Sequence, residues 1–417
     1  MKKVFKILGF SLLFIILTGL VASYFGYKNY WAKDPNVKVI PENVIYFSET
    51  YEECRENFRK EVAELSGKYD SVELGSINVA SEIDSDLTVD WCYIPAQKEK
   101  QKLVVLNSGL HGIEGYTGNA IQLMFIEEVL KEEQLDNIGI LFIHGINPYG
   151  FKYRRKVTEN NVDLNRNCVV DQSMYAGSNE GYGKLTSMLM PDGEVSLSNL
   201  RNQFFYLVAI AKIVKESMPV LRQAALQGQY QYPGGIYYGG TEFEPQMKQL
   251  KPLLIEKINN YQMLVNVDLH TAYGERGTQH LFLNPVEDEQ VMNGIETIFE
   301  GEKIDWGGGD DFYTINGEYV GWVESLTDKF HIPMLLEYGT LDSQTTFGSL
   351  KSIQVMINEN QGAHYGYKKE KFEAQAKGLF NEMYYPTSEV WRSKVIGDAN
   401  AILNKMMTNL KEYSIEE

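Results

Sequence analysis

Short apolar runs recur through the middle of the chain, and segments with apolar residues at helical spacing lie between them. The runs cover residues 103–106, 138–143, 263–269 and 331–338, and each has the composition of a buried parallel strand. Between the first two runs, residues 117–130 carry apolar side chains on one helical face, which predicts a strand–helix–strand crossover. The pattern as a whole predicts an α/β domain.

Weaker patterns complete the predicted organisation. Residues 71–79 and 87–93 alternate between apolar and polar side chains, as strands do. Apolar side chains recur at helical spacing over 51–65, 198–228, 367–383 and 388–407. Residues 227–240 are predicted to form a loop rich in glycine, tyrosine and proline. We expect a leader over residues 1–32, a linker over 33–44, one large α/β domain over 45–385 and a C-terminal helical tail over 386–417.

The first residues of the chain have the pattern of a membrane-targeting segment. Lys2, Lys3 and Lys6 precede an apolar stretch over residues 7–24, which reaches the lower limit of length for a bilayer span, and aromatic side chains follow it. We expect an uncleaved, single-pass membrane anchor. A cleaved signal peptide is the alternative, and a buried core helix is a third. Either of the first two exports the remainder of the chain, so the main domain is predicted to lie outside the cytoplasm.

The charge and the cysteine content argue against two classes of protein. The chain has 56 acidic and 39 basic residues, a formal net charge of -17, and it has no basic stripe, so a nucleic acid partner is not expected. Three widely spaced cysteines are too few for a disulfide framework and allow one bridge at most. With 417 residues and 44% hydrophobic content, the chain can build a large core.

Three of the four predicted parallel strands end in residues that can hold a metal ion or move a proton. His111 and Glu114 follow the first strand, His270 follows the third, and Glu337 lies near the end of the fourth. In open α/β sheets, ligands bind beyond the carboxyl ends of the strands. Two imidazoles and one carboxylate would leave the fourth position of a catalytic zinc ion open, and a further carboxylate beside it can act as a general base.

These residues also have plain structural interpretations. A His-x-x-Glu pair is more often a surface turn, an isolated histidine is more often a satisfied core residue, and Glu337 can equally form a salt bridge with a buried arginine. Asp268 lies two residues before His270, so the same face of the strand should carry both and the carboxylate should orient the imidazole.

A polar loop that is rich in asparagine and arginine follows the second predicted strand. Arg154, Arg155 and Arg166 lie in this loop. Arginines in such a place can polarise a scissile carbonyl or bind a substrate carboxylate with two parallel hydrogen bonds. We interpret Arg154 and Lys156 as a solvated basic face, and Asp163 as the structural partner of one arginine.

Five motifs, in this order, resemble the zinc carboxypeptidase family of the carboxypeptidase A type. They are His111-Gly-Ile-Glu114, Asn147-Pro-Tyr-Gly150, Asp163-Leu-Asn-Arg-Asn167, Asp268-Leu-His270 and Leu336-Glu337-Tyr-Gly. The chain is most similar to a poorly characterised bacterial branch of the family, which also resembles it in the loop at 227–240. The resemblance implies a three-layer α/β/α fold with a mixed, mostly parallel sheet.

Carried over position by position, the resemblance implies a catalytic zinc site. His111, Glu114 and His270 take the places of the ligands of one zinc ion, Zn2+, and Glu337 takes the place of the general base and acid.

The resemblance also implies a set of substrate-binding residues. Arg155 takes the place of the arginine that polarises the carbonyl, and Asn165 and Arg166 that of the pair that binds the C-terminal carboxylate. Tyr313 resembles the mobile tyrosine that closes over the substrate, and its alternative is a tyrosine in an ordinary loop.

The predicted function is therefore zinc-dependent hydrolysis of the C-terminal peptide bond of peptides. The related succinylglutamate desuccinylase and aspartoacylase group shares the zinc pattern, which makes a zinc amidohydrolase acting on N-acyl amino acids the first alternative. A non-catalytic envelope-binding module is the second. The segment between Arg166 and His270 is longer than in the pancreatic enzymes, so the residue preference does not transfer. The expected substrate carries a free carboxylate in both enzymatic interpretations.

Overall fold

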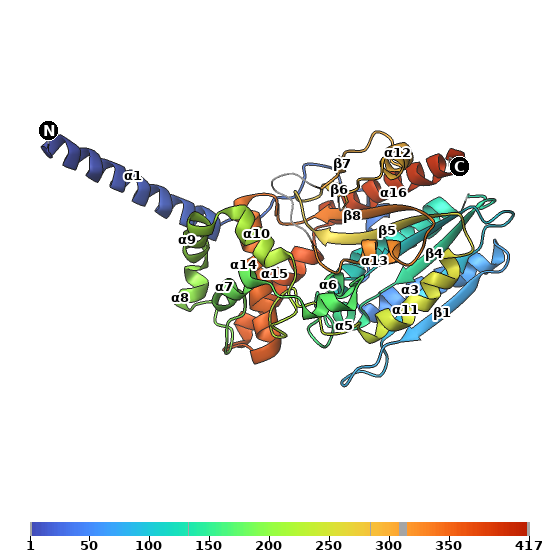
Figure 1. The fold of residues 1–417 in the computed structure, drawn as a ribbon, viewed down its shortest axis with the longest axis horizontal. Helices are drawn as coiled ribbons and strands as arrows, with labels where there is room; N and C mark the ends of the chain where they lie inside the picture. Colours follow the sequence, from blue (N-terminus) through green and yellow to red (C-terminus); the bar gives the residue numbers. More distant parts are fainter. Residues whose placement is uncertain (1, 132, 284, 308–314, 415–417) are drawn as a thin grey trace.

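One mixed β-sheet runs through the centre of the domain (Figure 1). The computed structural model describes residues 2–131, 133–283, 285–307 and 315–414. The strands are β1 (Glu73–Asn78), β2 (Thr88–Ile94), β3 (Lys102–Ser108), β4 (Ile138–His144), β5 (Met263–Ala272), β6 (Gln279–Phe282), β7 (Ile304–Asp305) and β8 (Phe330–Gly339). Their order across the sheet is β1-β2-β4-β3-β5-β8-β6-β7.

The four central strands of the sheet are parallel. β4, β3, β5 and β8 pair side by side in one direction, and the strands that flank them, β2 and β6, run antiparallel to them. The prediction of a mixed α/β sheet is confirmed, and all six strands that the hydrophobic pattern indicates are present. β6 and β7 are not predicted, because four and two residues are too few to show a period.

The α-helices fill the segments between the strands. In the part of the chain described, they are α1 (Lys2–Lys28), α2 (Pro41–Val44), α3 (Tyr51–Glu64), α4 (Gly115–Met124), α5 (Pro148–Lys152), α6 (Leu164–Asn167), α7 (Glu180–Leu189), α8 (Leu200–Gln203), α9 (Phe205–Glu216), α10 (Met218–Leu226), α11 (Pro245–Ile258), α12 (Glu289–Ile298), α13 (Tyr319–Glu324), α14 (Thr346–Tyr365), α15 (Glu370–Tyr384) and α16 (Glu389–Glu412). The predicted helix at 198–228 is thus three helices, with a break at Ser217, whose φ is 70°.

Each face of the sheet carries its own apolar core, because successive side chains of a strand point to opposite faces. Leu103 and Val105 of β3 point to one core, which α11, α13, α14 and α15 cover. Val104 and Leu106 point to the other, which α3, α4, α12 and α16 cover. Helices therefore lie on both faces of the sheet (Figure 1), and α16, which the sequence patterns assign to a tail, contributes buried side chains to the second core.

Two long helices, α11 and α14, are not predicted from the hydrophobic pattern. α11 contains Pro252, which normally ends a helix. α14 buries polar side chains, among them Asn358, Asn360 and Gln361, so its polar residues are not confined to the solvent side. At the start of α16, the Ser388 hydroxyl accepts the backbone N–H of Trp391 and caps the helix.

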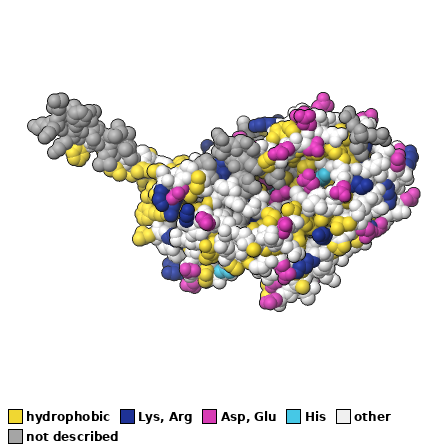
Figure 2. Space-filling view, viewed as in Figure 1, with side chains coloured by type: hydrophobic (Ala, Val, Ile, Leu, Met, Phe, Trp, Pro, Cys, Tyr) yellow, Lys and Arg dark blue, Asp and Glu magenta, His cyan; other side chains and the backbone are white. Residues whose placement is uncertain are grey.

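Helix α1 covers the predicted leader and projects from the body of the molecule (Figure 1). Its end packs on the domain, where the rings of Tyr27 and Tyr206 stack with centroids 4.7 Å apart and the Tyr27 hydroxyl donates to Gln354 Oε1 at 2.7 Å. Exposed apolar side chains lie around this junction (Figure 2). None of the described helices has the length and apolar character that a membrane span needs, and the membrane anchor stays a prediction. The location outside the cytoplasm and the fate of the leader stay predictions.

Candidate metal centre

The topology of the sheet brings the ends of three parallel strands together. β5 lies between β3 and β8, and His270 of β5 is the register partner of Glu337 of β8. On the other side, Ser108 at the end of β3 pairs with Leu269. The chain leaves β3 through a short 3-10 turn, Gly112–Glu114, so His111 and Glu114 lie beside His270.

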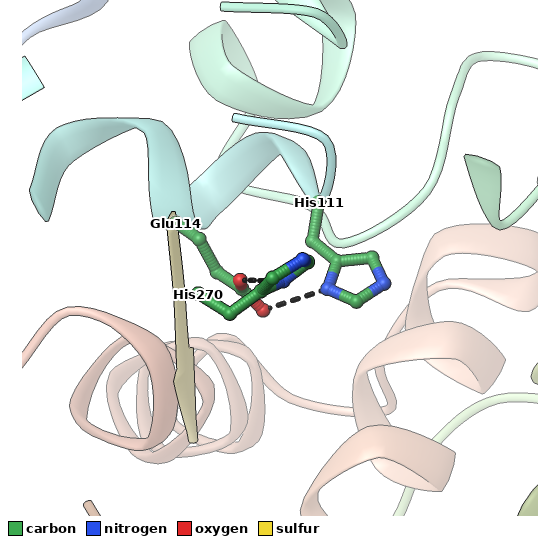
Figure 3. A group of neighbouring side chains, drawn as sticks. All are labelled: His111, Glu114 and His270. Atoms are coloured by element: carbon green, nitrogen blue, oxygen red, sulfur yellow. Dashed lines mark hydrogen bonds and ion pairs between the residues drawn. The ribbon is translucent and has the colours of Figure 1, made fainter. Parts of the chain in front are cut away.

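Glu114 lies between the two histidines (Figure 3). Its Oε1 is 2.9 Å from Nδ1 of His111, and its Oε2 is 2.9 Å from Nδ1 of His270. One potential ligand atom from each of the three residues falls within a group whose members are all within 4.8 Å of one another. All three side chains are buried. The predicted ligand residues are therefore brought to one point.

A carboxylate holds each imidazole from the side that faces away from Glu114. Nε2 of His270 is 2.7 Å from Oδ2 of Asp268, and Nε2 of His111 is 3.2 Å from Oδ1 of Asp163. Such carboxylate–histidine pairs fix the ring orientation and the tautomer of metal-binding histidines. Both Nδ1 atoms are thus directed at the same place, and Asp268 has the orienting role predicted for it.

The charges at the site fit a divalent cation. Burial raises the pKa of Glu114, but the adjacent His111 and His270 outweigh it and lower that pKa overall. Burial likewise raises the pKa of Asp163, whereas Lys156 and His111 hold it well below its usual range. Carboxylates that stay ionised around two imidazoles form an anionic pocket, and a cation would replace the protons that the Nδ1 atoms share with Glu114. Two histidines and one glutamate are a ligand set of catalytic zinc.

Glu337 differs from the other carboxylates of the site. Burial, with Glu114 and Asp268 nearby, raises the pKa of Glu337 to about 8, against the opposing effect of His270. Its Oε1 accepts the backbone N–H of Tyr273 at 2.8 Å. No salt bridge joins Glu337 to a described arginine, the alternative that the sequence left open. A buried carboxylate whose pKa lies near neutrality can exchange protons at the pH of a cell.

A cavity of about 440 Å³ opens next to these residues. His111, Glu114, His270 and Glu337 all belong to its lining, and α10, α14 and the end of α15 contribute much of the rest. A substrate in this cavity would therefore contact the metal ligands and Glu337 together.

Asn165 and Arg166 line the same cavity. The Arg166 guanidinium donates to backbone carbonyl oxygens, from Nη1 to Asn165 at 2.6 Å and from Nε to Leu226 at 3.1 Å. No carboxylate among the described residues forms a salt bridge with it, so its charge can pair with an anion in the cavity. The Asn165 side chain accepts the backbone N–H of Tyr319 at 2.9 Å, which holds this part of the wall in place.

Arg155 does not reach the cavity, in contrast to the role that the sequence motif assigns to it. Its Nε donates to Glu359 Oε1 at 2.8 Å, and Nη2 donates to Asn161 at 3.2 Å, so the guanidinium is bound away from the metal ligands. The predicted position is wrong because neighbouring residues in an irregular loop point in different directions, and their order alone does not say which one faces the site.

Lys156, the next residue, faces the site instead. It lines the cavity, its ammonium group forms an ion pair with Asp163, and it lies 4.6 Å from the centroid of the Tyr237 ring. The interpretation of Lys156 as part of a solvated face is therefore wrong, and the partner of Asp163 is a lysine rather than an arginine. Burial, together with Arg166, lowers the pKa of Lys156 despite the opposing Asp163.

A family comparison covers most of this chain. Residues 47–398 match the model of a protein family that is described as "Protein of unknown function (DUF2817)". The chain belongs to the DUF2817 family. Among curated proteins, none matches this DUF2817 protein.

Solved structures similar to this DUF2817 protein include metallocarboxypeptidases. Bovine thrombin-activatable fibrinolysis inhibitor, in complex with tick carboxypeptidase inhibitor, is 13% identical, with 88% of this chain and 99% of that chain covered and a TM-score of 0.47. Carboxypeptidase A from Helicoverpa armigera is 14% identical, with 79% and 73% covered and a TM-score of 0.39. A metallo-carboxypeptidase from Pseudomonas aeruginosa is 11% identical, with 83% and 69% covered and a TM-score of 0.39. These are the proteins that the motifs resemble.

Tyr313, the predicted closing tyrosine, lies outside the described residues. The position of Lys156 next to Arg155 in the sequence could have identified it as a residue of the cavity. Arg222 of α10 also lines the cavity, but no motif of the sequence includes it.

We expect Asp268→Asn to weaken zinc binding by the DUF2817 protein about 10- to 100-fold, the usual effect of losing a carboxylate that orients a ligand histidine. The amide keeps the size of the side chain but not its charge, so the His270 ring is held less firmly in the ligating tautomer. Competition with a chromogenic chelator measures the affinity. Asp90→Asn is the matched control, because Asp90 is also a buried aspartate of this sheet but pairs with Arg59. Equal zinc affinities in the wild type and Asp268→Asn would contradict the expectation.

Proposed function

We propose that this protein is a zinc-dependent hydrolase that cleaves the C-terminal peptide bond of peptides. The observation that carries the proposal is that one cavity contains three elements of such a reaction. It has a metal-ligating group of two histidines and a glutamate, a buried carboxylate with a pKa near neutrality, and an arginine with no carboxylate partner among the described residues.

The metal-binding part of the proposal rests on His111, Glu114 and His270. Asp163 and Asp268 orient the two imidazoles so that both Nδ1 atoms can bind one cation. A zinc ion bound there supplies Lewis acidity, which polarises a carbonyl group and makes a water molecule more acidic.

Glu337 moves the proton in the proposed reaction. In its ionised form, the carboxylate takes a proton from the attacking water, and it then gives that proton to the nitrogen of the leaving amine. The backbone N–H of Tyr273 holds Oε1 of Glu337, which leaves the other oxygen for this exchange. Burial keeps the carboxylate poorly solvated and thus basic.

The cations of the cavity bind the substrate in the proposed reaction. Arg166 presents a planar guanidinium, which suits the two oxygens of a C-terminal carboxylate. Lys156 lies beside the metal ligands and stabilises negative charge on the scissile carbonyl oxygen, the role that the sequence motif assigned to Arg155.

Metal analysis and a substrate panel test the proposal. The full-length protein, loaded with zinc, is offered peptides with a free C-terminus, the same peptides with a C-terminal amide, and N-acyl amino acids. Stepwise release of the last residue from the free-carboxylate peptides is expected. Exclusive cleavage of N-acyl amino acids would replace the peptidase by the amidohydrolase alternative, and zinc binding without any hydrolysis would favour a binding module.

Replacing Arg166 by alanine is expected to raise KM for free-carboxylate peptides about 10- to 100-fold, because a charge-assisted hydrogen bond contributes roughly 1.5–3 kcal/mol. Steady-state kinetics on paired peptides, with a C-terminal carboxylate or a C-terminal amide, gives the measurement. The wild type should discriminate between the members of a pair, and Arg166→Ala should not. An unchanged preference for the carboxylate in Arg166→Ala would remove this residue from substrate binding.

A further inference from the structure

Tyr384, the last residue of α15, is tied to the strand that carries His270. The Thr271 hydroxyl donates to the backbone carbonyl oxygen of Tyr384 at 2.7 Å. The backbone N–H of the same threonine donates to Glu114 Oε2 at 3.1 Å. A single residue of β5 thus connects the end of α15 to a predicted metal ligand, so the position of Tyr384 is fixed relative to the metal centre.

The Tyr384 hydroxyl is available to a molecule in the cavity. Tyr384 belongs to the lining that also includes His111, Glu114, His270 and Glu337. Only 2% of its surface is exposed. The hydroxyl forms no hydrogen bond with a described residue, and it is not one of the fully enclosed polar atoms that lack a partner. Because buried tyrosine hydroxyls normally have a hydrogen-bond partner, we expect a bound substrate to supply it.

The surroundings of the hydroxyl keep it protonated. Burial raises the pKa of Tyr384 well above its usual value, and the nearby Tyr237, Glu114, Asp163 and Glu337 raise it further. At any pH near neutrality, the hydroxyl is therefore a neutral hydrogen-bond donor. Its neighbours include a predicted metal ligand and the proposed base, and the scissile carbonyl group of a substrate has to lie between these two.

We propose that Tyr384 is a catalytic residue whose hydroxyl donates a hydrogen bond to the scissile carbonyl oxygen as negative charge develops there. This inference rests on the proposed function and adds a residue that no motif of the sequence selects. Lys156 contributes a positive charge in that reaction, and Tyr384 adds a neutral donor. The hydroxyl keeps its proton throughout, so no bond forms or breaks at Tyr384. A donor held in place by the fold is effective because it needs no reorganisation during the reaction.

Tyr384→Phe tests the inference, because it removes the hydroxyl and keeps the ring. In the full-length, zinc-loaded protein, kcat on a free-carboxylate peptide should fall about 10²- to 10³-fold, the usual effect of losing one donor to an oxyanion, while KM stays within about threefold of the wild type. Zinc affinity and the melting temperature should be unchanged, since the hydroxyl has no partner among the described residues. The pH profile of kcat/KM should keep its midpoint, because Glu337 still titrates.

Tyr385→Phe is the matched control. Tyr385 is the next residue along the chain and is also buried, but it is not part of the cavity lining. Its hydroxyl donates to the backbone carbonyl oxygen of Ser48 at 2.9 Å. Tyr385→Phe loses this hydrogen bond, so it should unfold at a lower temperature than the wild type and keep the wild-type kcat. The two variants are thus expected to have opposite effects on stability and on turnover.

Binding of a phosphonate analogue of the peptide provides a measurement that does not depend on turnover. The tetrahedral, anionic phosphonate group resembles the transition state, and such analogues bind more tightly than substrates do. By titration calorimetry, Tyr384→Phe should bind the phosphonate more weakly by the same factor by which kcat/KM falls. Its affinity for the released C-terminal amino acid, which has no scissile carbonyl group, should equal that of the wild type.

The outcomes separate this inference from the proposed function. Wild-type kcat in Tyr384→Phe, or an effect on KM alone, would overturn the inference and leave the peptidase in place. A lower kcat with a shifted midpoint of the pH profile would assign the hydroxyl to Glu337 instead of the substrate, and a loss of zinc or of stability would give it a structural role; either result contradicts the inference. If the zinc-loaded wild type cleaves no peptide, the proposed function fails and the inference fails with it.

Discussion

Glu337→Gln is expected to bind zinc like the wild type and to lose turnover by roughly 10²- to 10⁴-fold, the contribution of a general acid–base. The amide has nearly the shape of the carboxylate and can still accept the backbone N–H of Tyr273. It cannot take a proton from water, so the loss should appear in kcat rather than in KM. Steady-state kinetics with metal analysis of the same preparation gives both quantities.

The pH dependence of kcat/KM in the wild type should report the ionisation of Glu337. Burial raises the pKa of Glu337 to about 8 in the absence of a metal ion. A divalent cation beside it favours the ionised form, so the pKa in the zinc-loaded protein should lie below that value. Because the base must be ionised, kcat/KM should rise with pH through this pKa, and the residual activity of Glu337→Gln should lack that rise.

A stability measurement shows whether Glu337→Gln loses activity because it lacks the base or because it unfolds. The pKa of Glu337 is raised from 4.5 to about 8 in the folded protein, so its ionisation progressively destabilises the metal-free fold as the pH rises from 4.5 to about 8. At pH 8, Glu337→Gln without metal should therefore unfold at no lower temperature than the wild type without metal. Wild-type turnover in Glu337→Gln would rule out the proposed base.

His270→Ala is expected to abolish activity and to reduce zinc affinity by more than the roughly 10- to 100-fold effect of losing an orienting carboxylate. The ring supplies one of three ligands, and its loss leaves the buried Glu114 and Asp268 without a common partner. Burial lowers the pKa of His270, but the adjacent Asp268 and Glu114 outweigh it and raise that pKa well above its usual value.

The measurement is zinc content after dialysis, together with activity before and after chelation. Chelation should inactivate the wild type reversibly, with recovery when zinc is returned, and His270→Ala should not recover. His270→Gln keeps most of the side-chain volume, and it replaces the alanine variant in these measurements if that variant does not fold. His364→Ala is the matched control, because His364 is an exposed histidine in the last turn of α14. One equivalent of tightly bound zinc in both His270 variants would contradict the predicted ligand set.

Most of the metal centre could be predicted from the sequence because it is built on regular strands. The buried runs of β3, β5 and β8 are recognisable from composition, and side chains at the carboxyl ends of adjacent parallel strands meet at one edge. Asp268 could be assigned to His270 for a similar reason, since residues two apart in a strand share a face. In these cases the period of the backbone fixes the direction of the side chain.

The substrate-binding residues could be predicted only in part, because they lie on irregular loops and on helices that are distant in sequence. The family resemblance selected Asn165 and Arg166, which line the cavity, but it also selected Arg155, which pairs with Glu359 of α14. The helical pattern at 198–228 did not show that it is broken at Ser217 or that Arg222 lies on the cavity side of α10. These directions depend on packing between distant segments.

By itself, the sequence determined the class of the fold, the central strands, and the two histidines and two glutamates at the strand ends, because short-range periodicity and composition encode each of these. The tertiary structure alone decided that Lys156 rather than Arg155 lines the cavity with the metal ligands, that α16 belongs to the core, and that Arg222 lines the same cavity as Arg166. Those positions result from contacts between segments far apart in the chain, and no local pattern of residues records such contacts.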